Sequence, residues 1–169
     1  IKEFVRIRAR GGVGMFILPG TPYGAPSRGR PAISEDRYIC QWKELKELAS
    51  EYGMSLFCQL HPSKIQAGRV KKISLPEDYG IEEINKVIQA YAEGALRARM
   101  ATLDGVEIHG GHAHEVAQFL SPFYNRRKDK YGGDLAGRSR FAVEIVRSIK
   151  KVAGEDFPVI FRFSAKEYI

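Results

Sequence analysis

Three histidines lie close together in the segment GVEIHGGHAH at 105–114. His109, His112 and His114 could act as metal ligands, because neutral imidazole nitrogens bind zinc and related ions. They could instead donate hydrogen bonds to one substrate oxygen and stabilise the negative charge that develops on it during a reaction. The two glycines after His109 let backbone or ligand approach closely. Spacing alone leaves both interpretations open.

Two further polar side chains interrupt apolar segments. Arg162 stands between Phe161 and Phe163, which predict burial on both sides. A buried guanidinium needs an anionic partner, since unpaired desolvation is costly, and that partner is either a ligand or an internal acid such as Glu107. Gln59 lies in SLFCQL, and its amide can donate and accept at once, which suits a heterocycle edge with a carbonyl and an N–H. A hydrogen bond to a neighbouring loop is the alternative for Gln59.

These side chains must be positioned by alternating strands and helices. The periodicity predicts helices ending near residue 10 and spanning 35–51, 81–101 and 137–153, and strands at 13–19, 55–60, 105–109 and 158–164. Apolar strands that alternate with helices imply a parallel sheet covered by helices, which occurs in open doubly wound sheets and in (β/α)8 barrels.

The placement of the polar residues distinguishes these two architectures. No GxGxxG turn follows any predicted strand, so a dinucleotide-binding sheet is not indicated. Gln59, His109 and Arg162 instead fall at the carboxyl ends of separate strands, where barrel enzymes carry their active sites. Because a whole barrel needs about 250 residues, we expect residues 1–169 to form a single α/β domain that is a partial (β/α)8 TIM barrel of about four βα units.

Composition indicates a globular protein, with 44% hydrophobic and 28% charged residues. No segment approaches the roughly 20 apolar residues of a membrane-spanning helix, and the N-terminal residues are too charged for a signal peptide, so we expect a cytoplasmic protein without a membrane partner. Cys40 and Cys58 lack CxxC spacing and are expected to pack in the core.

The net charge of +7 raises the question of a nucleic-acid partner. Acidic residues are interleaved with the basic ones, and no nucleic-acid-binding module is recognisable. An anionic small molecule, such as a phosphate-bearing cofactor or substrate, explains the excess charge without one.

The segment 105–164 closely resembles the old yellow enzyme family of flavin-dependent oxidoreductases, especially the branch of 2,4-dienoyl-CoA reductase and trimethylamine dehydrogenase. The motifs QFLSPFYNRR, DKYGGDL and RSRF follow the histidines in the family's order. ARGGVGMFILPGT at 9–21 and FCQLHP at 57–62 resemble the family's second and third strands. The first strand of the barrel and its last three strands would then lie outside this chain.

The resemblance implies an FMN cofactor that NADH or NADPH recharges. Gln59 and Arg162 would face the pyrimidine end of the flavin, and the backbone at Gly20 would run close to it. His109 and His112 match the pair that grips the carbonyl oxygen of an activated alkene while hydride passes to the β-carbon. An iron–sulfur cluster, present in the dienoyl-CoA reductase branch, would belong only to a longer parent chain.

His114 departs from the family pattern, because many members carry a tyrosine there that protonates the α-carbon. Imidazole, with an ordinary pKa of about 6.5 against about 10 for tyrosine, could serve as the acid at neutral pH. Alternatively the proton comes from elsewhere, the reaction is a desaturation or an amine oxidation, or His114 points away from the pocket.

The sequence thus predicts a flavin-dependent oxidoreductase that reduces the activated C=C bond of an enone or enoyl substrate. Two alternatives come from other classes. One is a non-catalytic half-barrel that self-associates through its open edges as a homo-oligomer. The other is a metal-dependent barrel hydrolase built on the histidine cluster.

Overall fold

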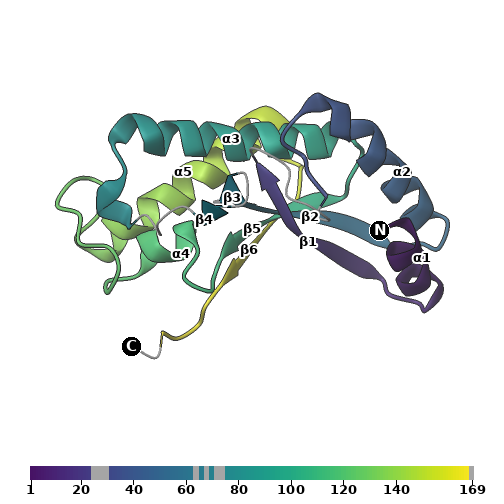
Figure 1. The fold of residues 1–169 in the computed structure, drawn as a ribbon, viewed down its shortest axis with the longest axis horizontal. Coiled ribbons are helices and arrows are strands. Elements are labelled where there is room, and N and C mark those ends of the chain that lie inside the picture. The colour runs from purple at the N-terminus through teal and green to yellow at the C-terminus, as the bar shows by residue number, and fades with distance from the viewer. Residues whose placement is uncertain (24–30, 63–64, 67–68, 71–74, 168–169) are drawn as a thin grey trace.

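The computed structural model describes residues 1–23, 31–62, 65–66, 69–70 and 75–167. Its main sheet is parallel, with the strand order β1-β2-β5-β6. These strands are β1 (Met15–Tyr23), β2 (Ser55–Pro62), β5 (Gly105–Gly110) and β6 (Val159–Phe163). The helices are α1 (Lys2–Arg10), α2 (Ile39–Ser50), α3 (Ile81–Met100), α4 (Glu115–Leu120) and α5 (Leu135–Ala153). As Figure 1 shows, α3 and α5 run side by side over the sheet, with α2 beyond them toward the N-terminal strands.

Smaller elements complete the described chain. They are the short 3₁₀ helices η1 (Asp36–Tyr38) and η2 (Pro76–Asp78), and the antiparallel pair β3 (Ile65–Gln66) and β4 (Arg69–Val70). The predicted helices and strands are confirmed, whereas α4, β3 and β4 were not predicted. Strand β1 continues into the segment that the sequence predicts as a loop, and residues 24–30 of that loop lie outside the described residues.

Local chemistry explains where the long helices begin. At the start of α3, the Glu83 carboxylate accepts a hydrogen bond from the Gly80 N–H at 2.9 Å. At the start of α5, the Asp134 carboxylate accepts one from the Gly137 N–H at 2.8 Å. Both carboxylates satisfy backbone donors that have no partner within the helix, and they also face the positive end of the helix dipole.

The two faces of the sheet differ in character. Side chains alternate along each strand, and one set is apolar and fully buried beneath the helices: Leu56, Cys58, Leu60, Val106 and Ile108. These residues join large buried side chains from the helices and loops, among them Trp42, Tyr91, Phe119, Phe141 and Phe157, in one core. The opposite face carries the polar residues of the candidate site.

One expectation about the cysteines needs correction. Cys58 is buried as predicted, but Cys40 is exposed on α2. The apolar face of α2 is formed by Trp42, Leu45, Leu48 and Ala49, and Cys40 lies outside that set.

Within the described part of the chain, no helix is long and apolar enough to cross a membrane.

The sheet has β1 and β6 at its two edges. Phe163 on β6 is 65% exposed, and Val159 and Phe161 before it are only half-buried. An edge strand presents backbone groups that another strand can pair with. Self-association of the chain through these edges stays a prediction.

Candidate active site at the polar face of the sheet

The predicted polar residues lie on one face of three neighbouring strands. In the register between strands, Gln59 on β2 is paired with Glu107 on β5, and His109 on β5 with Arg162 on β6. Paired residues of parallel neighbours project to the same side, and Glu107 and His109 are two positions apart on one strand. The fold therefore brings Gln59, His109 and Arg162 together, and it adds Glu107.

Gln59 and Glu107 form a buried polar pair on this face, at 5% and 6% exposure. The Gln59 Nε2 donates a hydrogen bond to the Glu107 Oε1 at 2.5 Å. Gln59 thus has a side-chain partner on the next strand, in place of the loop backbone that was its alternative from sequence. Glu107 has Gln59 as its partner. The Arg162–Glu107 salt bridge considered from the sequence is not among the ion pairs of the described residues.

The predicted burial of Arg162 is wrong for this chain, because its side chain is exposed. The physical reason lies in the strand geometry: Phe161 and Phe163 project to the opposite face and cannot cover it. β6 is also the edge of the sheet, so no further strand of the described chain packs beside Arg162. The guanidinium next to His109 is accordingly accessible to a ligand.

Gly20 lies within β1, where the register with β2 shifts between Leu18 and Thr21. Leu18 pairs with Cys58 and Thr21 with Leu60, so residues 19–20 stand opposite the single residue Gln59. An extra residue on one strand is a bulge, and bulges are common beside active sites. The structure thereby places the backbone at Gly20 across from the Gln59 position.

The three histidines come together at the end of β5. The His109 ring lies 5.2 Å from the His112 ring and 4.5 Å from the His114 ring, measured between centroids. His109 is buried, His112 is exposed and His114 is half-buried. Among the described residues, no group of three His, Cys, Asp or Glu side chains is arranged to hold a metal ion.

The turn that carries the histidines has a left-handed backbone. His112 has φ 54° and Ala113 has φ 52°, a conformation that costs free energy for residues other than glycine. Hydrogen bonds hold the turn closed: Gln118 Nε2 donates to the Ala113 carbonyl at 3.0 Å, and the His114 N–H donates to the Gly111 carbonyl at 3.1 Å. The positions of the histidines are therefore determined by the turn and by α4 behind it.

Gly110 is required by packing where β5 meets this turn. A Cβ there would lie 2.7 Å from the Phe161 ring and 2.8 Å from the Arg162 carbonyl oxygen. Because the second contact is with backbone, it cannot be relieved by moving a side chain. The absence of a side chain at residue 110 lets β5 and β6 stay paired up to His109 and Arg162.

Sequence reasoning missed Glu115, the first residue of α4, which directly follows His114 and is 3% exposed. Burial and a hydrogen bond with Glu115 raise the pKa of the Tyr79 hydroxyl well above its ordinary value. Burial, followed by the charge of Glu115, does the same for Tyr91. The hydrogen bond between Tyr79 and Glu115 ties the start of α4 to the segment before α3. The sequence signal was an acid at the start of the mostly apolar run EVAQFL.

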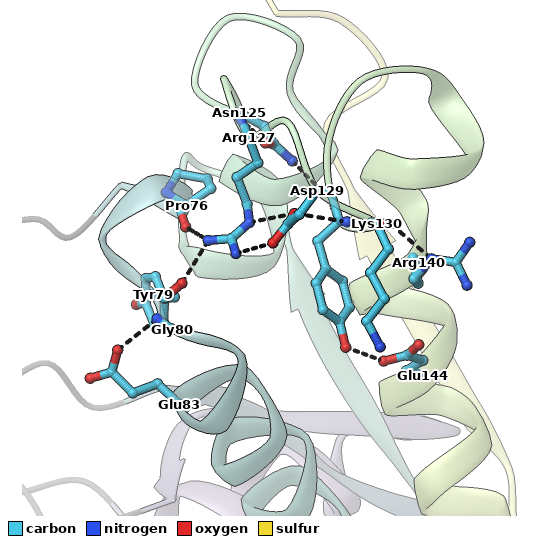
Figure 2. A network of polar contacts seen from close by, with 11 residues as sticks. Pro76, Tyr79, Gly80, Glu83, Asn125, Arg127, Asp129, Lys130, Arg140 and Glu144 are labelled. Carbon is cyan, nitrogen blue, oxygen red and sulfur yellow. Dashed lines mark hydrogen bonds and ion pairs between the residues drawn. The ribbon is translucent and has the colours of Figure 1, made fainter.

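The loop after α4 is built around Arg127, as Figure 2 shows. Its Nη1 donates to the Pro76 carbonyl at 2.5 Å and to the Tyr79 carbonyl at 2.7 Å. Its Nε donates to Asp129 Oδ1 at 3.0 Å, and its Nη2 contacts Asp129 Oδ2 at 2.5 Å. This pairing lowers the pKa of Asp129, because Arg127 hydrogen-bonds the charged carboxylate. Arg127 therefore ties this loop to the segment that leads into α3.

Two further side chains fasten the same loop. Asn125 Nδ2 donates to the Phe119 carbonyl at 2.7 Å and to the Tyr131 carbonyl at 2.8 Å. The Tyr131 hydroxyl donates to Glu144 on α5 at 2.7 Å. Glu144 is labelled in Figure 2. Burial, then this hydrogen bond and the charge of Glu144, raise the pKa of Tyr131 to about 12. The NRRKDKYGG segment is thus a scaffold that supports α4.

A family model and several known proteins match this chain in sequence. The model of the NADH:flavin oxidoreductase / NADH oxidase family matches residues 1–169. The NADH oxidase of Thermoanaerobacter brockii is 38% identical over 189 residues, covering 99% of this chain and 29% of that protein. The cinnamate reductase of Clostridium sporogenes is 35% identical over 192 residues, again covering 99% of this chain and 29% of its own length.

A solved structure shares the fold of this chain. Old Yellow Enzyme from Pichia sp. AKU4542 superposes with a TM-score of 0.78 at 24% identity, covering 96% of this chain and 50% of that chain. The partial barrel predicted from sequence and the predicted family resemblance are both confirmed. The chain belongs to the NADH:flavin oxidoreductase / NADH oxidase family, and its four parallel strands are part of an old yellow enzyme (β/α)8 barrel.

Proposed function

We propose that the protein carrying this chain reduces the activated C=C bond of an enone or enoyl-type substrate, with FMN as its cofactor and NADH or NADPH as its reductant. The observation that carries this proposal is the convergence of Gln59, Arg162 and the histidines on one face and at one end of neighbouring strands. The name of the 35% identical cinnamate reductase supports the substrate class, because cinnamate contains a C=C bond conjugated to its carboxylate.

The donor set fits the pyrimidine edge of a flavin, which alternates carbonyl oxygens and an N–H. The Gln59 amide offers both a donor and an acceptor, and the bulge opposite it brings backbone close. The accessible Arg162 guanidinium would hold negative charge at this edge. Bound FMN would supply the hydride, so the residues of this chain must bind the substrate and manage its charge and its proton.

His109 and His112 would hold the carbonyl oxygen of the substrate. His109 Nδ1 accepts a hydrogen bond from the Gly111 N–H at 3.4 Å, and in a neutral ring with this partner the proton would be on Nε2. That Nε2–H is then a donor in a buried setting, where it stabilises a developing enolate oxygen more strongly than water would. His112, exposed on the turn, would provide the second donor.

Replacing Arg162 with alanine is expected to weaken FMN binding by about 10- to 100-fold, the range for losing a hydrogen bond to a charged partner. Fluorescence titration of the apoprotein with FMN measures this. The matched control is Arg147→Ala, which removes an exposed guanidinium from α5 and should leave the FMN dissociation constant unchanged. Equal affinity in the Arg162 variant and the unsubstituted protein would contradict this assignment.

His114 is the candidate proton donor to the α-carbon, since its ring lies 4.5 Å from the His109 ring. Replacing it with phenylalanine should lower kcat for alkene reduction by about 100-fold, a usual contribution of general acid catalysis. His114→Tyr should restore activity and extend it to higher pH, because tyrosine stays protonated to about pH 10. The pH profiles of both variants measure this, and an unchanged rate in His114→Phe would assign the proton to another source.

The proposed function itself is tested by the visible spectrum of the purified protein and by FMN released on denaturation. NADH-dependent reduction of cinnamate, followed by product analysis, then tests the substrate class. A protein that takes up no FMN from a saturating solution would refute the proposal.

A further inference from the structure

Glu107 is a buried acid in the middle of the candidate site. It is 6% exposed and lies on β5, two residues before His109. A carboxylate in such a place requires a partner, since uncompensated burial of charge is costly. Its partner is the Gln59 amide, at 2.5 Å on the neighbouring strand.

This contact determines which way the Gln59 amide is turned. A glutamine side chain has one end that donates and one that accepts, and the two ends are almost equal in shape. An ionised carboxylate only accepts hydrogen bonds, so it selects the orientation with Nε2 toward Glu107. The carbonyl oxygen of Gln59 is thereby turned away from Glu107.

Arg162 does not take part in orienting the Gln59 amide. In the register, Arg162 is paired with His109, whereas Glu107 is paired with Ile160, two residues before Arg162 on β6. Among the ion pairs of the described residues, none joins the Arg162 guanidinium to Glu107, and Arg162 is exposed whereas Glu107 is buried. The acid and the arginine therefore act on different parts of the polar face.

We infer that Glu107 is a positioning residue, which locks the Gln59 amide so that its carbonyl oxygen and second N–H are presented to the flavin in one orientation. The inference rests on the proposed function, because it assigns what Gln59 must recognise. Without Glu107 as an obligate acceptor, Gln59 samples both orientations, and only one of them matches the donor and acceptor pattern of the pyrimidine edge.

The most informative variant is Glu107→Gln. It keeps the volume of the side chain but no longer selects one orientation of the Gln59 amide. An amide at residue 107 satisfies either orientation of Gln59, since it can both donate and accept. We expect Glu107→Gln to weaken FMN binding about tenfold in the full protein, measured by fluorescence titration. Glu144→Gln is the matched control, because Glu144 also accepts a hydrogen bond, from Tyr131 at 2.7 Å, but lies on α5 away from this face.

A double-mutant cycle separates positioning from a general structural role. In a Gln59→Ala background there is no amide to orient, so Glu107→Gln should change the FMN dissociation constant less than twofold. An equal loss in both backgrounds would overturn the inference, and so would unchanged affinity of the single variant.

A spectroscopic measurement tests the orientation of the Gln59 amide directly, even where a loss of stability in the variants also lowers their affinity for FMN. The side-chain amide resonances of Gln59 in the ¹⁵N-labelled apoprotein should shift on Glu107→Gln, and unshifted resonances would overturn the inference. Failure of the proposed function appears separately, as an unsubstituted protein that binds no FMN, and this inference then falls with it.

Discussion

Replacing both His109 and His112 with alanine is expected to lower kcat/KM for alkene reduction by about 10³-fold, while FMN stays bound. The two imidazoles lie together at the end of β5, with ring centroids 5.2 Å apart. Their loss removes hydrogen bonds that strengthen as the substrate oxygen becomes negative, and this raises the free energy of the transition state. Steady-state kinetics with cinnamate, together with the FMN content of the variant, measures the effect.

A donor-preserving variant is the control for this experiment. His112→Asn keeps an N–H that can reach the substrate oxygen, so it should retain far more activity than His112→Ala. If the double alanine variant turned over at the rate of the unsubstituted protein, the histidines would have no part in holding the substrate.

The second large effect is on stability. Arg127→Ala should lower the free energy of unfolding by about 3 kcal/mol, because several charge-assisted hydrogen bonds are lost together. The guanidinium joins the Pro76 and Tyr79 carbonyls to Asp129, and its side chain is only 8% exposed. Urea or thermal unfolding measures the change. Arg126→Ala is the matched control, since its exposed neighbouring side chain should contribute within about 0.5 kcal/mol.

This stability difference should depend on pH in a defined direction. The folded-state pKa of Asp129 is lowered by its hydrogen bond with Arg127. A lowered pKa contributes stability that is present above the unfolded value of about 3.9 and is lost as pH falls through the folded value. The gap between the unsubstituted protein and Arg127→Ala should therefore narrow below about pH 4. A constant gap down to pH 2 would show that Asp129 takes no part.

Strand and helix periods alone sufficed for the main elements of the fold. The apolar runs around Leu56 and Val106 predicted buried strands, and the spacing of three and four residues along 81–101 predicted a long amphipathic helix. The motifs from 105 to 164 were specific enough to indicate the family. The short α4 was missed because its helix has only six residues, less than two turns of periodic signal.

The candidate site was only half predictable. Gln59, His109 and Arg162 stood out because polar residues at strand ends are conspicuous in the sequence itself. Glu107 was recognised as an acid near Arg162, yet its true partner is Gln59, since pairing between strands depends on a register that no local pattern specifies.

The sequence by itself determined the elements, the family and the residue types of the site, because these follow from periodicity and from motifs within short segments. Only the tertiary structure decided which side chains meet and which are covered. Arg162 is exposed because β6 is the edge of the sheet, and the histidine rings converge because the left-handed turn at His112 and Ala113 folds them back. Burial and contact arise between segments far apart in the chain, so they depend on packing that one-dimensional patterns do not contain.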